Sequence, residues 1–171
     1  MDEKSVKVLV IGTDHALQRH QDTMPDREEL RAEFEGRLRG MLKERKVSLI
    51  AEEAGGDNDV WEHLKHEDEL AEAMGLSDLL GLGSKTVDAP VPTIAKTIAE
   101  ERPKDIRHAD IRSPNADALT IEQRDDAMAT KILQILKGGE EAIVIVGDTH
   151  REGVVTRLKN AGLLVESIQF P

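Results

Sequence analysis

Two histidines of this chain stand in the same short motif, a glycine followed by two other residues and then the histidine. The motifs run from Gly12 to His15 and from Gly147 to His150, and each follows an apolar run. A third apolar run ends in the pair Glu52-Glu53. A buried carboxylate beside imidazole groups is either a metal ligand or a general base, because an unpaired buried charge is too costly to keep. These residue types therefore predict a site, if the fold brings them together.

Three apolar runs must position these residues, and each has the composition of a strand that is covered on both faces. The runs span residues 6–11, 47–51 and 142–146. If they are neighbouring parallel strands, their polar ends meet at one carboxyl edge, where open α/β sheets bind ligands. Successive side chains of a strand point to opposite faces, so only one of Glu52 and Glu53 is expected to enter the site.

Arg124 is a further candidate, because its spacing puts it on the apolar face of a predicted helix over 121–137. An arginine there needs an anionic partner, which is either a carboxylate of the site or a carboxylate or phosphate of a substrate. Asp110 ends a predicted strand over 106–111 and is either another acid of the site or a turn former. Gly12, Gly147 and Asp110 are the predicted cofactor-binding residues.

The remaining elements alternate between helix and strand. Thr120 and Gln123 form a capping box that opens the helix over 121–137. The other predicted elements are helices over 27–45, 59–74, 92–101 and 152–160, a loop over 75–92 and a closing strand over 163–170. This order predicts a single α/β domain over residues 1–171, with a mainly parallel central sheet and helices on both of its faces.

The composition of the chain limits the kinds of binding partner that are expected. The chain has 171 residues, a net charge of −11, only three aromatic side chains (one Trp and two Phe) and no cysteine. Nucleic acid and an anionic membrane are therefore not expected as partners, and disulfides and thiolate sites are excluded. No apolar run is long enough for a membrane span, and no signal-peptide pattern is present, so we expect a cytoplasmic protein. The sequence leaves a homodimer open.

The ordered set of motifs resembles a superfamily that joins TraB/PrgY pheromone-shutdown proteins, Tiki-type metalloproteases, erythromycin esterases and ChaN-like haem-binding proteins. The motifs are Gly12 to His15, Glu52-Glu53, Arg124 to Met128 in an E-R-[DN]-x-x-M-like helix, and Gly147 to His150. The likeness extends from about residue 6 to residue 155. The chain departs from the pattern at Gln123, which separates Glu122 from Arg124, and it is shorter than most members.

The resemblance implies a reduced erythromycin-esterase- or ChaN-like core with a hydrolase-like site, and a divalent metal (Mn, Co or Zn) as in the Tiki branch. His15, Glu53 and His150 would be the metal ligands. The leading hypothesis is a hydrolase of peptide or ester bonds. In it His15 and a glutamate bind the metal or activate water, His150 is a ligand or proton donor, and Arg124 holds a carboxylate or the developing oxyanion. The alternative is a non-catalytic module that uses the same residues to bind a small ligand or regulate a partner.

Overall fold

The computed structural model describes residues 6–18, 28–53 and 92–170. By its internal contacts the chain divides into two units, Met1–Ala54 with Pro92–Pro171, and Gly55–Val91. The second unit, with the predicted helix over 59–74, lies outside the described residues. All the elements below belong to the first unit, and a single domain over the whole chain stays a prediction.

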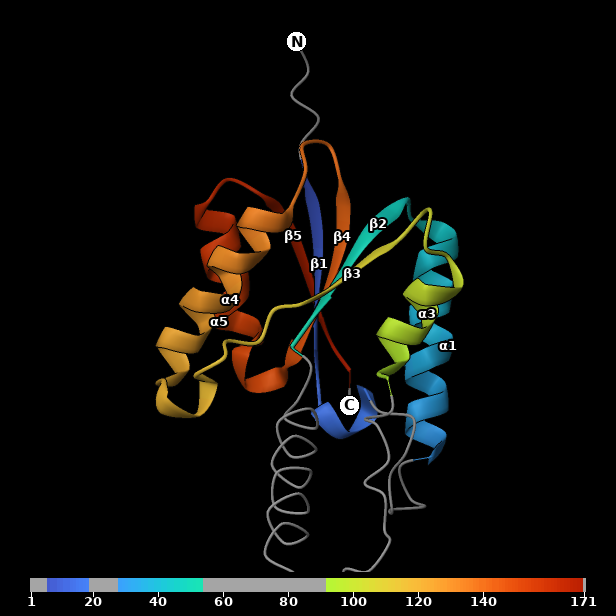
Figure 1. Cartoon of the computed structure of the whole chain (residues 1–171), viewed down its shortest axis with the longest axis horizontal. Helices are drawn as coiled ribbons and strands as arrows, with labels where there is room; N and C mark the ends of the chain where they lie inside the picture. Colours follow the sequence, from blue (N-terminus) through green and yellow to red (C-terminus); the bar gives the residue numbers. More distant parts are fainter. Residues whose placement is uncertain (1–5, 19–27, 54–91, 171) are drawn as a thin grey trace, which may run out of the picture. The chain divides into compact units, whose positions relative to one another are not determined.

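A five-stranded, all-parallel sheet forms the centre of this unit (Figure 1), which confirms the predicted α/β class. Its order is β3-β2-β4-β1-β5. The strands are β1 (Lys7–Thr13), β2 (Val47–Glu52), β3 (Arg107–Asp110), β4 (Glu141–Gly147) and β5 (Leu164–Gln169). The three apolar runs are therefore neighbours, with β4 between β2 and β1. Their polar ends meet at one edge, as the sequence predicts.

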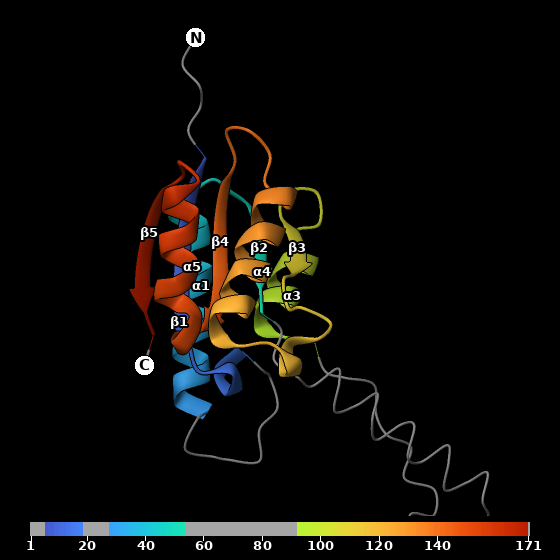
Figure 2. The same ribbon diagram turned by 90° about the vertical axis from the view of Figure 1, so that its left-hand side faces the viewer.

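Helices cover both faces of the sheet (Figures 1 and 2). They are α1 (Glu28–Glu44) and α3 (Ile94–Glu101) on one face, and α4 (Ile121–Ile135) and α5 (Asp148–Asn160) on the other. The next described helix after β2 is α3, on one face, and the helix after β4 is α5, on the other. Neighbouring strands followed by helices on opposite faces mark the kind of point where α/β sheets bind ligands.

Strand alternation divides the core into two apolar layers. In β1, for example, Leu9 and Ile11 pack with α1 and α3, whereas Val8 and Val10 pack with α4 and α5. The scarcity of aromatic residues leaves both layers almost entirely aliphatic. Phe34 and Phe170 are the aromatic members of the first layer.

Most helix boundaries lie within two residues of their predicted positions, and the capping box of Thr120 and Gln123 is present. The start of α5 is different, because the helix begins at Asp148 and not at residue 152. Gly147 is its N-cap residue and Asp148 places a negative charge in the first turn, where the helix dipole favours one. His150 consequently lies in the first turn of a helix. A short 3-10 helix over His15–Gln18 was not predicted.

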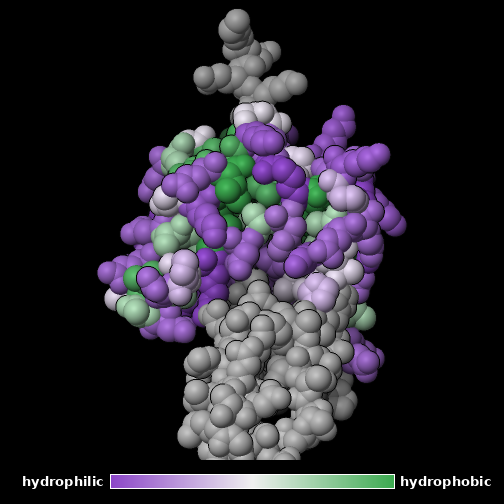
Figure 3. All heavy atoms as spheres, viewed as in Figure 1, coloured by the Kyte–Doolittle hydropathy of each residue, from purple (hydrophilic) through white to green (hydrophobic). Residues whose placement is uncertain are grey.

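Hydrophilic side chains cover most of the described surface in the view of Figure 3. Among the described helices, none combines the length and the apolar character that crossing a bilayer requires.

Candidate active site at the carboxyl edge of the sheet

Glu53 is the centre of a buried polar cluster between the ends of β2 and β4. Its backbone N–H still donates to the carbonyl oxygen of Ile145 (2.8 Å), so the strand geometry continues one residue beyond β2. Its side chain is 2% exposed. One carboxylate oxygen, Oε1, accepts from Nη2 of Arg124 at 2.6 Å, and the other accepts from the Gly147 N–H at 3.3 Å. The guanidinium and the N–H compensate for the burial of this charge.

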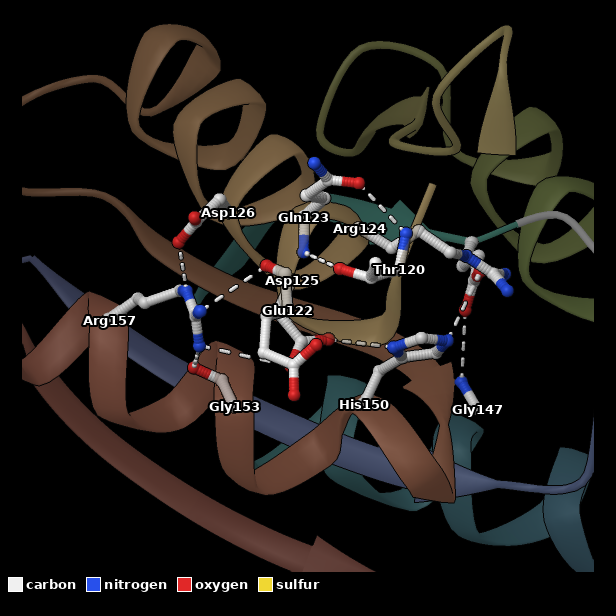
Figure 4. A network of polar contacts seen from close by, with 11 residues as sticks. Thr120, Glu122, Gln123, Arg124, Asp125, Asp126, Gly147, His150, Gly153 and Arg157 are labelled. Atoms are coloured by element: carbon white, nitrogen blue, oxygen red, sulfur yellow. Dashed lines mark hydrogen bonds and ion pairs between the residues drawn. The ribbon is translucent and has the colours of Figure 1, made fainter. Parts of the chain in front are cut away.

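His150 approaches Glu53 from the first turn of α5, and Asp125 of α4 fixes its ring (Figure 4). Nδ1 of His150 lies 2.7 Å from Oδ1 of Asp125. Both side chains are 6% exposed, so the contact is shielded from solvent. A carboxylate oxygen accepts, so Nδ1 is the donor in this contact and Nε2 is the nitrogen that is left to accept a proton. Nε2 lies 4.0 Å from Oε1 of Glu53, beyond hydrogen-bond distance.

Arg157 of α5 supports Asp125 from the side away from His150. Nη1 of Arg157 lies 3.8 Å from Oδ2 of Asp125 and donates to the Gly153 carbonyl oxygen at 3.0 Å. Its Nε donates to Asp126, and this hydrogen bond is the main cause that raises the pKa of Arg157 above its ordinary value. The guanidinium therefore remains a fixed positive charge beside the Asp125 carboxylate.

A glycine on α5 makes this arrangement sterically feasible. A Cβ atom at Gly153 would lie 1.9 Å from Oδ2 of Asp125. Any side chain at residue 153 would displace the Asp125 carboxylate, so glycine here lets Asp125 keep the position in which it contacts His150.

Asp125 is the functional residue that sequence reasoning missed, although a signal for it exists. It lies three residues before Met128 and seven before Ile132, on the stripe of α4 that the structure buries. The apolar face that the sequence predicts for this helix instead includes Ile121, which is 48% exposed. A carboxylate on the buried stripe needs a partner, and His150 supplies it.

Glu52 belongs to a different cluster on the α1/α3 face. Its Oε1 lies 2.6 Å from Nε2 of His108 in β3 and also accepts from the hydroxyl of Thr93, the N-cap residue of α3. Its Oε2 is buried and has no hydrogen-bond partner among the described residues. Of the two glutamates, Glu53 is therefore the one that lies with Arg124 and His150, and the two carboxylates lie on opposite faces of the sheet.

The other predicted site residues lie nearby with different contacts. A Cβ at Gly12 would lie 2.5 Å from Oδ1 of Asp148, so this glycine permits the start of α5 to approach β1. Asp110 is exposed, and its Oδ1 accepts from the backbone N–H of Arg112 at 2.9 Å, as in a turn. His15 opens the 3-10 helix after β1, and its side chain lies outside the described part. The cofactor-binding roles of Gly12, Gly147 and Asp110 stay predictions.

An open pocket of about 370 Å³ lies beside this cluster, at the ends of β1 and β4. Thr13, Gly147, Thr149 and Phe170 are among the residues that line it. Gly147 belongs both to the pocket wall and to the hydrogen bonds of Glu53. A small molecule bound in the pocket would therefore lie next to the Glu53 cluster.

The described donors do not by themselves fit a metal ion. Oε1 of Glu53 already has a guanidinium nitrogen at 2.6 Å, and Nδ1 of His150 is engaged by Asp125. Within residues 6–18, 28–53 and 92–170, no three histidine, aspartate or glutamate side chains are grouped as metal ligands would be. Metal binding by His15, Glu53 and His150 stays a prediction, since the His15 side chain is outside the described part.

Comparisons with protein-family models, with curated proteins and with solved structures find no match to this chain. The resemblance to the TraB, Tiki and erythromycin-esterase superfamily therefore stays an expectation, based on its four motifs.

Proposed function

We propose that the protein is a hydrolase of ester or peptide bonds in which the pair Asp125–His150 acts as the general base. The observation that carries the proposal is the 2.7 Å contact at Nδ1 of His150, combined with the 4.0 Å separation between Nε2 and Glu53 Oε1. An imidazole that is oriented by a carboxylate and has its second nitrogen facing a reaction centre is the arrangement of many hydrolases.

The 4.0 Å separation suits a nucleophilic water. One water oxygen can lie about 2.8 Å from both Nε2 and Oε1, the usual length of such hydrogen bonds. It would donate one proton to each atom and direct a lone pair at the substrate carbonyl. His150 takes a proton as the oxygen attacks, and the carboxylate of Asp125 stabilises the imidazolium that forms. The same proton then passes to the leaving alcohol or amine.

Arg124 is placed to stabilise the negative charge that develops on the carbonyl oxygen. Its side chain is 26% exposed, compared with 2% for Glu53, so the guanidinium extends from the buried carboxylate towards the surface. Only Nη2 is used in the contact with Glu53. The other N–H groups can donate to an oxyanion or to a substrate carboxylate.

Activity measurements on matched variants test this proposal. Purified protein is assayed against chromogenic esters and fluorogenic peptides, and His150→Gln is compared with wild type. Loss of the general base should lower kcat/KM by roughly 10²–10⁴-fold. His108→Gln is the control, because it removes an imidazole that contacts the other glutamate, on the opposite face. If wild type hydrolyses no substrate faster than His150→Gln does, the general-base role is wrong.

One observation favours a non-catalytic binding module as the second candidate. Glu53 is already paired with Arg124, and Asp125 is paired with both His150 and Arg157. Such a compensated network can also hold a small polar ligand without chemistry. This candidate predicts that a ligand raises the unfolding temperature while no product forms.

A further inference from the structure

A second group of buried polar side chains lies on the opposite face of the sheet from Glu53. Besides Glu52, three described residues have buried side-chain nitrogen or oxygen atoms without any hydrogen-bond partner among the described residues. The atoms are Oγ1 of Thr13, both amide atoms of Gln18 and Nη1 of Arg31, together with Oε2 of Glu52. Leaving a buried donor or acceptor unpaired is costly, so a cluster of such atoms calls for a binding partner.

Thr13 and Gln18 lie at the carboxyl end of β1 on the α1/α3 side. Leu9 and Ile11 pack into the α1/α3 layer, and Thr13 follows them with the same strand alternation. Gln18 ends the 3-10 helix that leads away from β1, and its neighbour Leu17 is part of the same layer. Both polar side chains are almost fully buried, with residue exposures of 1% for Thr13 and 0% for Gln18.

Arg31 lies in the first turn of α1, on the same face of the sheet. It is 8% exposed and opens the buried stripe of the helix that continues with Phe34. The ring of Phe34 packs edge-on against Phe170 at 5.3 Å, and the Phe170 N–H donates to the Gly12 carbonyl oxygen at 2.7 Å. Helix α1 therefore lies near the end of β1, and it also contacts the 3-10 helix that ends at Gln18.

The side chains of Arg31, Gln18 and Thr13 indicate the class of ligand that they would bind. A guanidinium is always charged, and a buried charge needs a counter-ion or several hydrogen bonds. Among the described contacts, no carboxylate pairs with Arg31. The guanidinium, the Gln18 amide and the Thr13 hydroxyl all have N–H or O–H groups to donate. Donors of this kind around one positive charge match the oxygens of a carboxylate or phosphate group.

We propose that Arg31, Gln18 and Thr13 form a binding site for a small anionic ligand with a carboxylate or phosphate group. Arg31 supplies the charge, and Gln18 and Thr13 supply hydrogen bonds. Glu52 is separated from β1 by β4 and is not part of the anion site, but its Oε2 can accept from an N–H or O–H group of a ligand that extends across β4. The site does not depend on the hydrolase proposal, because it uses none of Glu53, Arg124, Asp125 and His150, although Thr13 also lines the pocket beside them.

Anion-dependent unfolding of the full chain tests the site. Inorganic phosphate and succinate are titrated separately against sodium chloride at matched ionic strength, and the unfolding temperature and calorimetric binding are measured. We expect at least one of the two anions to raise the unfolding temperature saturably, as a ligand that binds only the folded state must. The anion that does so identifies the chemical group. Arg31→Met should weaken binding by roughly tenfold or more, the loss of a charge-assisted contact.

The ligand-free stabilities make the test independent of activity. Without added anion, Arg31→Met and Thr13→Val should unfold at the wild-type temperature or higher, because each removes an unpaired buried polar group. Lys43→Met, which removes an exposed cation from the same helix, should leave anion binding unchanged. The proposal is wrong if neither anion binds saturably, or if Arg31→Met binds the anion as well as wild type does. It is also wrong if both Arg31→Met and Thr13→Val unfold at a lower temperature than wild type without ligand.

Discussion

Glu52 and Glu53 are adjacent in the chain, yet their carboxylates bond to different partners on opposite faces of the sheet. Oε1 of Glu53 accepts from Arg124 at 2.6 Å on the α4/α5 face, and Oε1 of Glu52 lies 2.6 Å from Nε2 of His108 on the other. Strand alternation produces this separation. The two glutamates are neighbours in the sequence, but their carboxylates therefore belong to two separate polar clusters.

The two glutamates should respond differently to the same substitution. We expect Glu53→Gln to lower kcat/KM by at least tenfold and to destabilise the fold by about 1–3 kcal/mol, because it leaves Arg124 without its charged partner. Glu52→Gln should leave kcat/KM within about threefold of wild type, since no contact among residues 6–18, 28–53 and 92–170 links it to His150. Kinetics and urea unfolding of both variants are the measurement. A larger loss of activity for Glu52→Gln would reverse the assignment.

Asp125 should be essential for the base strength of His150. Asp125→Asn is expected to lower kcat/KM by roughly 10²–10⁴-fold, since the amide cannot stabilise the imidazolium and can impose the wrong tautomer. Asp126→Asn is the matched control one residue later, where the carboxylate is 67% exposed and, among the described residues, contacts only Arg157. Equal losses in the two variants would indicate a structural effect of the α4–α5 contact.

Two glycine substitutions should have opposite effects. Gly153→Ala forces a methyl group into Asp125 Oδ2, so we expect about 1–3 kcal/mol of destabilisation and loss of activity. Gly36→Ala in α1 meets no atom within 4 Å and should stabilise the protein by about 0.5–1 kcal/mol. The denaturant midpoints of both variants, compared with that of wild type, measure these changes in stability. A stable, active Gly153→Ala protein would contradict the packing described between α4 and α5.

Acid should remove part of the stability that Glu140 provides. Burial raises the pKa of its carboxyl group, but hydrogen bonds from Ser48, Arg107 and the Lys137 N–H outweigh this and leave the pKa below its ordinary value. A group with a lowered folded pKa stabilises the fold above its unfolded pKa and loses that contribution as pH falls through the folded pKa. Glu140→Gln should therefore be less stable than wild type at pH 7, and the difference should shrink at about pH 3. A pH-independent difference would contradict this prediction.

Chelation distinguishes the general-base mechanism from the metal-dependent one that the resemblance implies. If Asp125–His150 alone activates water, hydrolysis should persist within about twofold after treatment with EDTA, since no step requires a Lewis acid. Activity that is lost with EDTA and restored by Mn²⁺, Co²⁺ or Zn²⁺ would instead support His15, Glu53 and His150 as ligands. His15→Ala should abolish that restoration.

Much of the fold follows from local patterns in the sequence. The apolar runs are long and bounded by glycine or charge, so β1, β2 and β4 and the parallel arrangement could be predicted. The site was predicted only in part. Arg124 and Glu53 were candidates individually, whereas their direct pairing depends on how α4 lies over β2, a tertiary relationship that no local pattern encodes.

Two features of the site were missed for identifiable reasons. Asp125 was overlooked because Ile121 suggested a helix face that the structure leaves exposed. The sequence pattern predicts that α5 starts only at residue 152, although Asp148 favours a helix N-terminus. For both reasons the contact between Asp125 and His150 could not be predicted. It requires the correct buried face of α4 and a helical conformation at residue 150.

The strand order has a consequence for how the protein is synthesised. β1 and β2 do not pair with each other, and each pairs with β4, whose first residue is Glu141. While a ribosome is still making the residues before Glu141, the two earliest strands have no common neighbour, and Glu53 lacks both Gly147 and His150. The cluster around Glu53 can therefore assemble only after most of the chain has been translated, so an interrupted translation product would carry its motifs without the assembled cluster.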